Sequence, residues 1–252
     1  MDLKRLIFTL FFYLTFFTQL QSQELDSLFT KINNKIKTYN QENYYSCNVI
    51  TKEFSMNKQW QTEKIKVTEK IITQKDSVRN EEIIKVTEYQ KDKEKDITDE
   101  VRKEQTKRLK ELEEERSDRT ENEESNTLSL SLESFFPFGD SLRDQYHFTL
   151  MADTVIDGQS YFRIQAISKE KSRDRIEGTY WIRTDTYTIT YMDLHFSQNP
   201  RFVKDLRMKL WFTEFDNNRW LPVRIWTHVH VGLIIKNIRM EVEEIYSEYV
   251  FE

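Results

Sequence analysis

The sequence is poor in residues that mark several common kinds of chemistry. It contains 4 glycines and a single cysteine, Cys47, among its 252 residues. So few glycines leave no glycine-rich loop of the kind that holds phosphates, which argues against nucleotide chemistry. A lone cysteine forms no internal disulfide, so the chain has to be stabilised by a packed core. Cys47 falls in an alternating run with Tyr45 and Val49, and we expect it to be a buried structural thiol.

Signatures of hydrolases and metalloenzymes are missing as well. The sequence contains neither G-x-S-x-G nor H-E-x-x-H. Its metal-like spacing is limited to His228 and His230, which a strand would present on one face. A third ligand, His195 or Asp193, would have to come from another strand, since a zinc site needs at least three protein ligands. We therefore favour a pair of surface histidines, with no metal, no cofactor and no enzymatic activity.

The charge balance also excludes a class of partner. The formal net charge is −5, and no basic stripe stands out of the kind that nucleic-acid phosphates require. Nucleic acid is therefore not an expected partner.

The N-terminus has the pattern of an export signal. Lys4 and Arg5 precede an apolar run over 6–17, and Ser22 is a small residue suited to cleavage. The run is shorter than the roughly 20 apolar residues of a membrane span. We predict a signal peptide over 1–22 and a mature domain over 23–252, with a retained membrane anchor as the alternative.

The mature chain begins with a helical pattern. Apolar residues over 24–40 recur at steps of three and four, which predicts an amphipathic helix. These residues are Leu25, Leu28, Phe29, Ile32, Ile36 and Tyr39. We expect this helix to cover a sheet.

Most of the remaining chain alternates with the period of strands, but residues 90–125 do not. Most of these residues are charged, and their few aliphatic side chains cannot build a core. Opposite charges four residues apart, such as Glu104 and Arg108, permit a helix. We expect a charged insertion that is either a solvated helix or disordered. A partner-binding coiled coil is the alternative, although no sustained heptad pattern supports it.

The C-terminal half contains apolar side chains beyond the needs of one sheet face. Short turns between strands predict an antiparallel meander, which is commonly wet on one face. Yet the strand near 189–196 places Ile189 and Tyr191 on one parity and further apolar side chains on the other. Either the aromatic residues all fill a core, or one set lines a site for acyl chains, which bind by burial. The candidate lipid-binding residues are Trp181, Tyr191, Met192, Leu194, Phe196 and Trp211.

The same half carries motifs that resemble a known family. They comprise "YFRI" after a "DG" turn, then G-x-x-W-I, "FVKDLR" and an aromatic-Leu-Pro strand, between Tyr146 and Tyr249. The pattern resembles the soluble region of Bacteroidota outer-membrane proteins of unknown function that are linked to carboxypeptidase-regulatory-like domains. That region in turn looks like the lipoprotein-carrier fold of the outer-membrane lipoprotein-sorting proteins. The resemblance implies a curved antiparallel sheet, an incomplete barrel, covered by an N-terminal helix.

Two functional hypotheses follow from the residues and the resemblance. The first is a non-catalytic module that binds lipid or lipoprotein acyl chains during maintenance of the cell envelope. The second is a structural or interaction protein of the outer membrane, with a packed core and a charged partner-binding arm. Both place the protein in the periplasm or on the periplasmic side of the outer membrane, where it can also contact the membrane peripherally.

Overall fold

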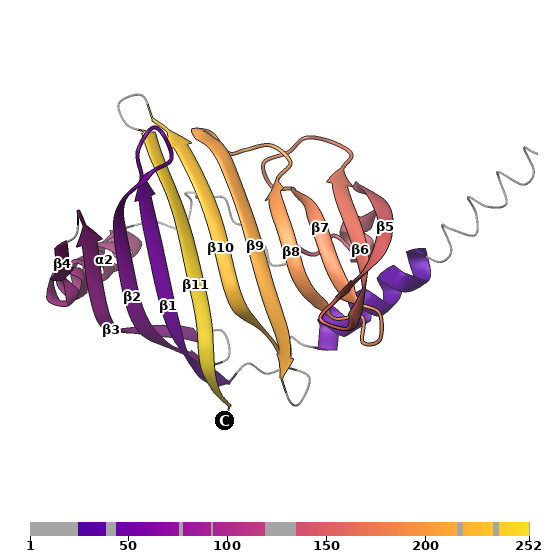
Figure 1. Ribbon diagram of the computed structural model, residues 1–252, viewed down its shortest axis with the longest axis horizontal. Coiled ribbons are helices and arrows are strands. Elements are labelled where there is room, and N and C mark those ends of the chain that lie inside the picture. The colour runs from indigo at the N-terminus through magenta and orange to yellow at the C-terminus, as the bar shows by residue number, and fades with distance from the viewer. Residues whose placement is uncertain are drawn as a thin grey trace, which may run out of the picture.

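The computed structural model describes residues 25–38, 44–75, 78–91, 93–118, 135–215, 219–233 and 237–251. The predicted signal peptide lies outside these ranges, as do residues 119–125 of the predicted insertion. The described chain forms one open antiparallel sheet with helices on one side (Figure 1). This arrangement confirms the predicted fold class of a mainly β-protein.

The sheet contains eleven strands in the order β4-β3-β2-β1-β11-β10-β9-β8-β7-β6-β5. The strands are β1 (Tyr45–Met56), β2 (Thr62–Lys75), β3 (Val78–Gln90), β4 (Lys93–Asp96), β5 (Tyr146–Ile156), β6 (Gln159–Ser168), β7 (Ile176–Arg183), β8 (Ile189–Phe196), β9 (Val203–Phe215), β10 (Arg219–Gly232) and β11 (Asn237–Phe251). Nine of the ten neighbour pairs are consecutive in sequence, as a meander requires, and the tenth joins β1 to β11. This pairing makes one sheet from both halves of the chain, while the domain boundaries at 23 and 252 stay a prediction.

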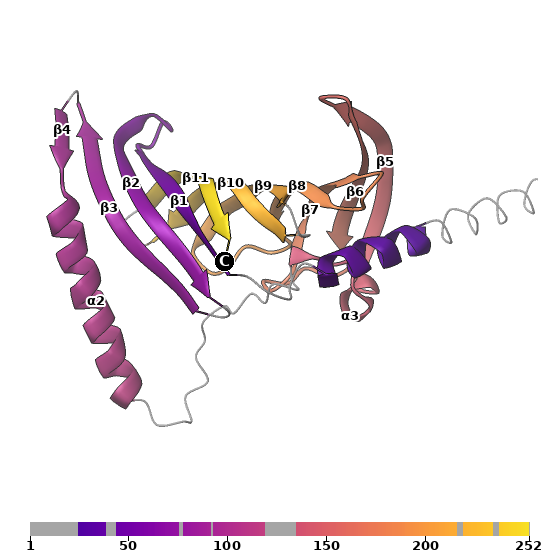
Figure 2. The same ribbon diagram turned by 90° about the horizontal axis from the view of Figure 1, so that it is seen from below.

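Helices lie on the same side of the sheet at its two ends, as Figure 2 shows. The N-terminal helix, residues 25–38, packs near β5–β9, and α2 (Thr98–Asp118) packs on β3. A short helix, α3 (Asp140–Arg143), precedes β5. We call this side of the sheet the helix side and the opposite side the open face.

The core lies between the N-terminal helix and the sheet. Leu28, Phe29 and Ile32 are buried on the helix, while Thr30 and Lys31 are exposed. This division confirms the predicted amphipathic helix. At its centre, the Phe29 ring lies 4.6 Å from the ring of Phe148 on β5. Burial of such large rings supplies much of the stabilisation of a core.

A smaller apolar cluster lies at the other end of the helix side. Cys47, Val49, Ile72 and Tyr246 come together there from β1, β2 and β11. The Cys47 thiol is buried, and this burial raises its pKa. The prediction of a buried structural thiol is therefore confirmed.

The described part of the charged insertion contains a short strand, β4, followed by the helix α2. Ahead of α2, the four-residue strand β4 extends the sheet beside β3, which the sequence did not predict. The Arg102 guanidinium donates to the carbonyl of Ile83 over 2.6 Å and to that of Ile84 over 3.1 Å. The first turns of α2 are thus attached to the sheet, whereas farther along the helix Leu109 is 55% exposed.

Candidate functional site

The six predicted lipid-binding residues separate onto two faces of the sheet. Met192, Leu194 and Phe196 of β8 are buried in the core on the helix side. Trp181, Tyr191 and Trp211 project from the open face and contact one another there. A single ligand therefore cannot contact all six residues.

A β-bulge separates Ile189 from Tyr191. Trp181 pairs with Tyr191, but the next residue of β7, Ile182, pairs with Ile189, so that β8 contains one extra residue. Because the bulge changes the side on which the strand presents its side chains, Ile189 is buried in the core with Met192. The prediction that Ile189 and Tyr191 share a face is wrong, and on β8 the open face receives Tyr191 from this set.

Interlocking rings occupy the region beneath the N-terminal helix. Phe138 lies 5.7 Å from Phe29 and 4.9 Å from Tyr180, measured between ring centroids. The Tyr180 hydroxyl donates to the carbonyl of Phe135 over 3.0 Å, and burial holds its pKa well above the usual value. These contacts are those of a packed core, so they leave apolar surface for a ligand only beyond the residues that the N-terminal helix covers.

An apolar strip continues from this core along the helix side of β10 and β11. We name it the helix-side strip; it consists of Val229, Val231, Ile238, Met240 and Val242. Val229 pairs with Met240 and Val231 with Ile238, and the core residue Leu206 of β9 pairs with Val229. The side chains are partly exposed, up to 36% at Ile238. The strip lies between the strands that carry the N-terminal helix and α2, and it is a continuous apolar surface.

The open face carries an aromatic row. The ring centroids of Trp181 and Tyr191 are 4.6 Å apart, and those of Tyr191 and Trp211 are 4.9 Å apart. Partial burial, followed by the nearby Asp193 carboxylate, raises the pKa of Tyr191 to about 12. The phenol is therefore neutral at physiological pH, so the row offers rings and a hydroxyl group without charge.

A second row on the open face is ionisable. Glu177, His195, Arg207, His228 and Glu241 are successive cross-strand partners from β7 to β11. The Trp60 ring, in the β1–β2 hairpin, stacks on His228 at 4.6 Å. This contact brings the hairpin over the open face of β10.

The histidines on this row bond to carboxylates. His228 Nδ1 lies 3.3 Å from Glu241 and its Nε2 lies 3.8 Å from Asp205. His195 interacts with Glu177, and strand β9 lies between it and His228 on β10. Within the described ranges, no three His, Cys, Asp or Glu side chains form a group that could hold a metal ion.

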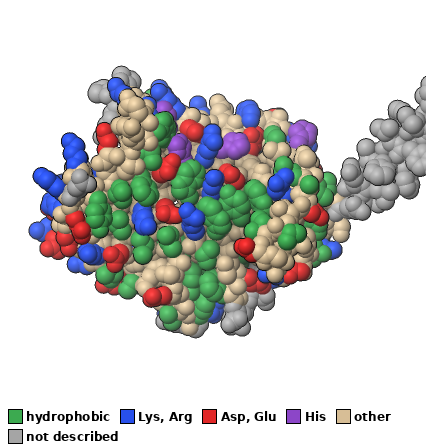
Figure 3. All heavy atoms as spheres, viewed as in Figure 1, with side chains coloured by type: hydrophobic (Ala, Val, Ile, Leu, Met, Phe, Trp, Pro, Cys, Tyr) green, Lys and Arg blue, Asp and Glu red, His purple; other side chains and the backbone are tan. Residues whose placement is uncertain are grey.

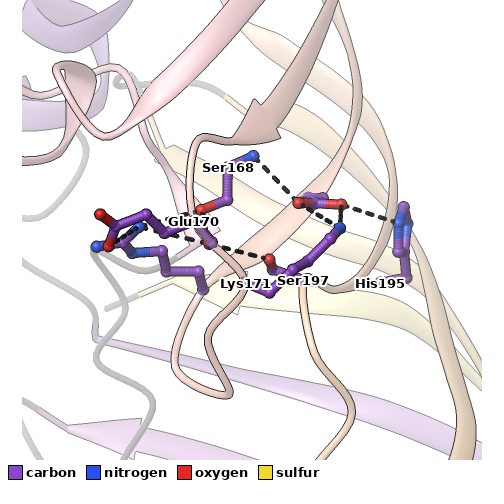
Figure 4. Close-up of polar contacts among 7 residues, drawn as sticks. Ser168, Glu170, Lys171, His195 and Ser197 are labelled. Atoms are coloured by element: carbon purple, nitrogen blue, oxygen red, sulfur yellow. Dashed lines mark hydrogen bonds and ion pairs between the residues drawn. The ribbon is translucent and has the colours of Figure 1, made fainter.

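The polar cluster around Glu177 stabilises a loop. Its carboxylate, 5% exposed, accepts from the Ser168 backbone N–H over 3.2 Å and from Lys171 over 3.1 Å, and lies 3.5 Å from His195 Nε2 (Figure 4). The Ser197 hydroxyl, near His195 in sequence, donates to the Glu170 carbonyl instead. A nucleophilic serine needs a bond to its base, so this cluster does not have the geometry of a hydrolase site.

A hollow of about 440 Å³ lies beside β2, β3 and β4. It is lined by Thr62, Glu63, Lys64, Ile65, Tyr89, Gln90, Lys91, Lys93 and Glu94. Such a charged lining does not suit an acyl chain, because burying charges against hydrocarbon is costly.

None of the described helices is both long and apolar enough to cross a membrane.

The described chain is a single open antiparallel sheet with helices on one side, and apolar side chains are exposed on both faces of the sheet. The chain belongs to a family of unknown function, DUF5686, which matches residues 29–249. The match includes β1–β4 and α2, well beyond the Tyr146–Tyr249 region in which the sequence motifs were found. No curated protein matches the chain.

Several solved structures are similar to this chain. A domain assigned to outer membrane lipoprotein sorting in Vibrio parahaemolyticus is 12% identical, covers 89% of this chain and 92% of its own, and superposes with a TM-score of 0.37. A DUF1329 family protein from Desulfovibrio piger is 10% identical, covers 90% of this chain and 92% of its own, and superposes with a TM-score of 0.36. A LolA superfamily protein from Nitrosomonas europaea is 12% identical, covers 87% of this chain and 93% of its own, and superposes with a TM-score of 0.34. At this level of identity and superposition, these similarities extend to neither ligand nor partner.

Proposed function

We propose that this domain binds an acyl chain of a lipid or lipoprotein, without catalysis, along the helix-side strip. The observation that carries the proposal is the strip itself, a partly exposed apolar surface continuous with the core. Two paired strands present it, so backbone hydrogen bonds between β10 and β11 hold its residues in place. It spans four residue steps of β11, roughly 13 Å, which suits an extended hydrocarbon chain better than a compact ligand.

Hydrocarbon binding needs no directional groups. Each methylene removed from water contributes about 0.8 kcal/mol, so several together on the strip give useful affinity. The predicted signal peptide and the family resemblance support action in the periplasm or on the periplasmic side of the outer membrane. There the protein would contribute to maintenance of the cell envelope, with peripheral membrane contact during ligand transfer.

Delipidated protein is expected to bind a fluorescent fatty acid, and Met240→Glu is expected to weaken that binding at least tenfold. The glutamate would place a charge against hydrocarbon, and tenfold corresponds to about 1.4 kcal/mol. Fluorescence titration measures the affinity, and native mass spectrometry of the undelipidated protein tests for bound lipid.

The matched control is Ile50→Glu, which adds the same charge on the open face, where Ile50 is 37% exposed. This variant should bind the probe as the wild type does. Met240→Leu should also retain binding, because it keeps the apolar surface. The proposal fails if folded wild-type protein neither carries lipid nor binds the probe.

A second candidate function follows from α2. Its first turns contact β3, and its exposed side chains include Lys103, Lys107 and Lys110. A charged helix attached at one end can present its free surface to an acidic partner in the envelope. The domain would then act as an interaction protein whose sheet is scaffold.

Reversing these three lysines to glutamate is expected to abolish co-purification with such a partner from envelope extracts. The melting temperature should stay within a few degrees of wild type, because exposed substitutions usually change stability by about 0.5 kcal/mol or less. The control reverses Lys58 and Lys75, which are exposed elsewhere. An unchanged set of co-purified proteins in the α2 variant would rule out this role.

A further inference from the structure

A row of five side chains crosses the open face from β6 to β10. Arg163, Trp181, Tyr191, Trp211 and Arg224 are successive direct cross-strand partners. Direct partners project from the same face of a sheet, so the three aromatic rings have an arginine at each end. We name these five residues the aromatic rung. With four strand spacings of roughly 4.8 Å, its ends are roughly 19 Å apart.

Core packing does not account for the aromatic rung. Its members lie on the open face, away from the N-terminal helix, and all three aromatic rings are partly exposed. Figure 3 shows hydrophobic side chains gathered over the middle of this face, with basic side chains beside them. The arrangement places large rings and guanidinium groups together at the surface.

The two arginines at the ends of the aromatic rung differ in their interaction partners. The Arg224 guanidinium lies 4.7 Å from the Trp211 ring centroid and 2.6 Å from the Glu243 carboxylate. The Arg163 Nε atom is buried and has no hydrogen-bond partner among the described residues. A buried donor without an acceptor is energetically costly, and an acidic ligand bound to this guanidinium would supply an acceptor.

We propose that the aromatic rung binds an acidic saccharide chain. A pyranose ring has an apolar C–H face that packs on an aromatic ring, and polar groups around its edge. The aromatic rings supply large, rigid contact area. Arginine binds carboxylate and phosphate through paired hydrogen bonds, so acidic groups toward the ends of the chain match Arg163 and Arg224.

The neighbouring row on the open face distinguishes a saccharide from an acyl chain. Two residues along each strand lie Asp193, Lys209 and Trp226, which are cross-strand partners. Hydrocarbon laid on the aromatic rung would desolvate the Asp193 and Lys209 charges, which is costly. Sugar hydroxyl groups can instead donate to the carboxylate and accept from the ammonium group.

Calorimetric titration of the full chain with an oligogalacturonide tests the proposal, with a maltooligosaccharide of equal length as the neutral comparison. The acidic chain should bind at least tenfold more tightly, and added salt should weaken its binding. Vesicles with and without lipopolysaccharide then identify the source, free polysaccharide or glycolipid headgroup.

Variants locate the site. Trp211→Ala and Arg163→Gln should each weaken acidic binding at least tenfold, whereas Trp211→Phe should retain most of it. Glu243→Gln should strengthen binding, because it removes the carboxylate that competes for Arg224. Arg207→Ala is the control, since Arg207 is a 63% exposed cation off the rung.

Equal affinity for acidic and neutral chains, no saccharide binding, or normal binding by Trp211→Ala would each overturn the assignment. Binding to phospholipid vesicles alone would do the same. The fatty-acid site lies on the opposite side of the sheet, so Trp211→Ala should leave probe binding unchanged. The two proposals therefore fail independently.

Discussion

Gly178→Ala is expected to lower the free energy of unfolding by about 3 kcal/mol, at the upper end of the cost of overpacking a core. Gly178 lies on β7 between Ala166 of β6 and Leu194 of β8. A Cβ atom there would lie 2.7 Å from Leu194 Cδ2 and 3.0 Å from its Cα, and would also meet the Asp193 carbonyl. Because Leu194 is fully buried, neither the strand nor the side chain has room to move.

Urea unfolding, followed by tryptophan fluorescence, measures the effect. Gly139→Ala is the matched control, because the nearest atom to its added Cβ would be Asn33 Oδ1 at 3.8 Å, an ordinary contact distance. We expect the control to unfold at the wild-type urea concentration. If Gly178→Ala does so as well, β7 and β8 are not closely packed at this position.

Local periodicity was sufficient to predict most of the elements. The three- and four-residue spacing of Leu28, Phe29 and Ile32 gave the buried side of the N-terminal helix, and alternation located the strands. These patterns show which side chains a segment buries, and the buried set does not depend on which other segment it packs against. The sheet type and its covering helix could therefore be predicted from sequence.

Features set by pairing between distant segments could not be predicted in this way. β1 pairs with β11, which lies at the other end of the chain, and the local sequence of neither strand indicates its partner. Likewise, the bulge opposite Trp181 depends on how β8 pairs with β7. A shift of one residue exchanges the two faces of a strand, so strict alternation placed Ile189 on the wrong side.

The same limit explains the outcome for the candidate site. Sequence parity separated Tyr191 from Met192 but could not say which face the N-terminal helix covers. Residues of both faces were therefore grouped together. The helix-side strip and the aromatic rung depend on register across several strands. Arg163 joins Trp181 through a pairing that no local motif reveals.

Phe138→Ala is expected to destabilise the domain by about 4 kcal/mol, within the range for removing a buried phenylalanine ring. Phe138 is 1% exposed and lies in the segment before α3. Its ring is within 6 Å of rings on three other elements, those of Phe29, Phe148 and Tyr180. The substitution would leave a cavity between a helix and two strands that cannot collapse together.

The expected fall in melting temperature is roughly 10 °C, given 2–4 °C per kcal/mol for a chain of this size. Scanning calorimetry measures it, with Phe202→Ala as the control because that ring is 46% exposed. Hydrogen exchange should also show faster exchange in residues 25–38, since Phe138 contacts the helix through Phe29. A fall of less than 3 °C with unchanged exchange would mean that the N-terminal helix does not depend on this ring. The helix would then be free to leave the sheet, and the core beneath it would become a second candidate for acyl binding.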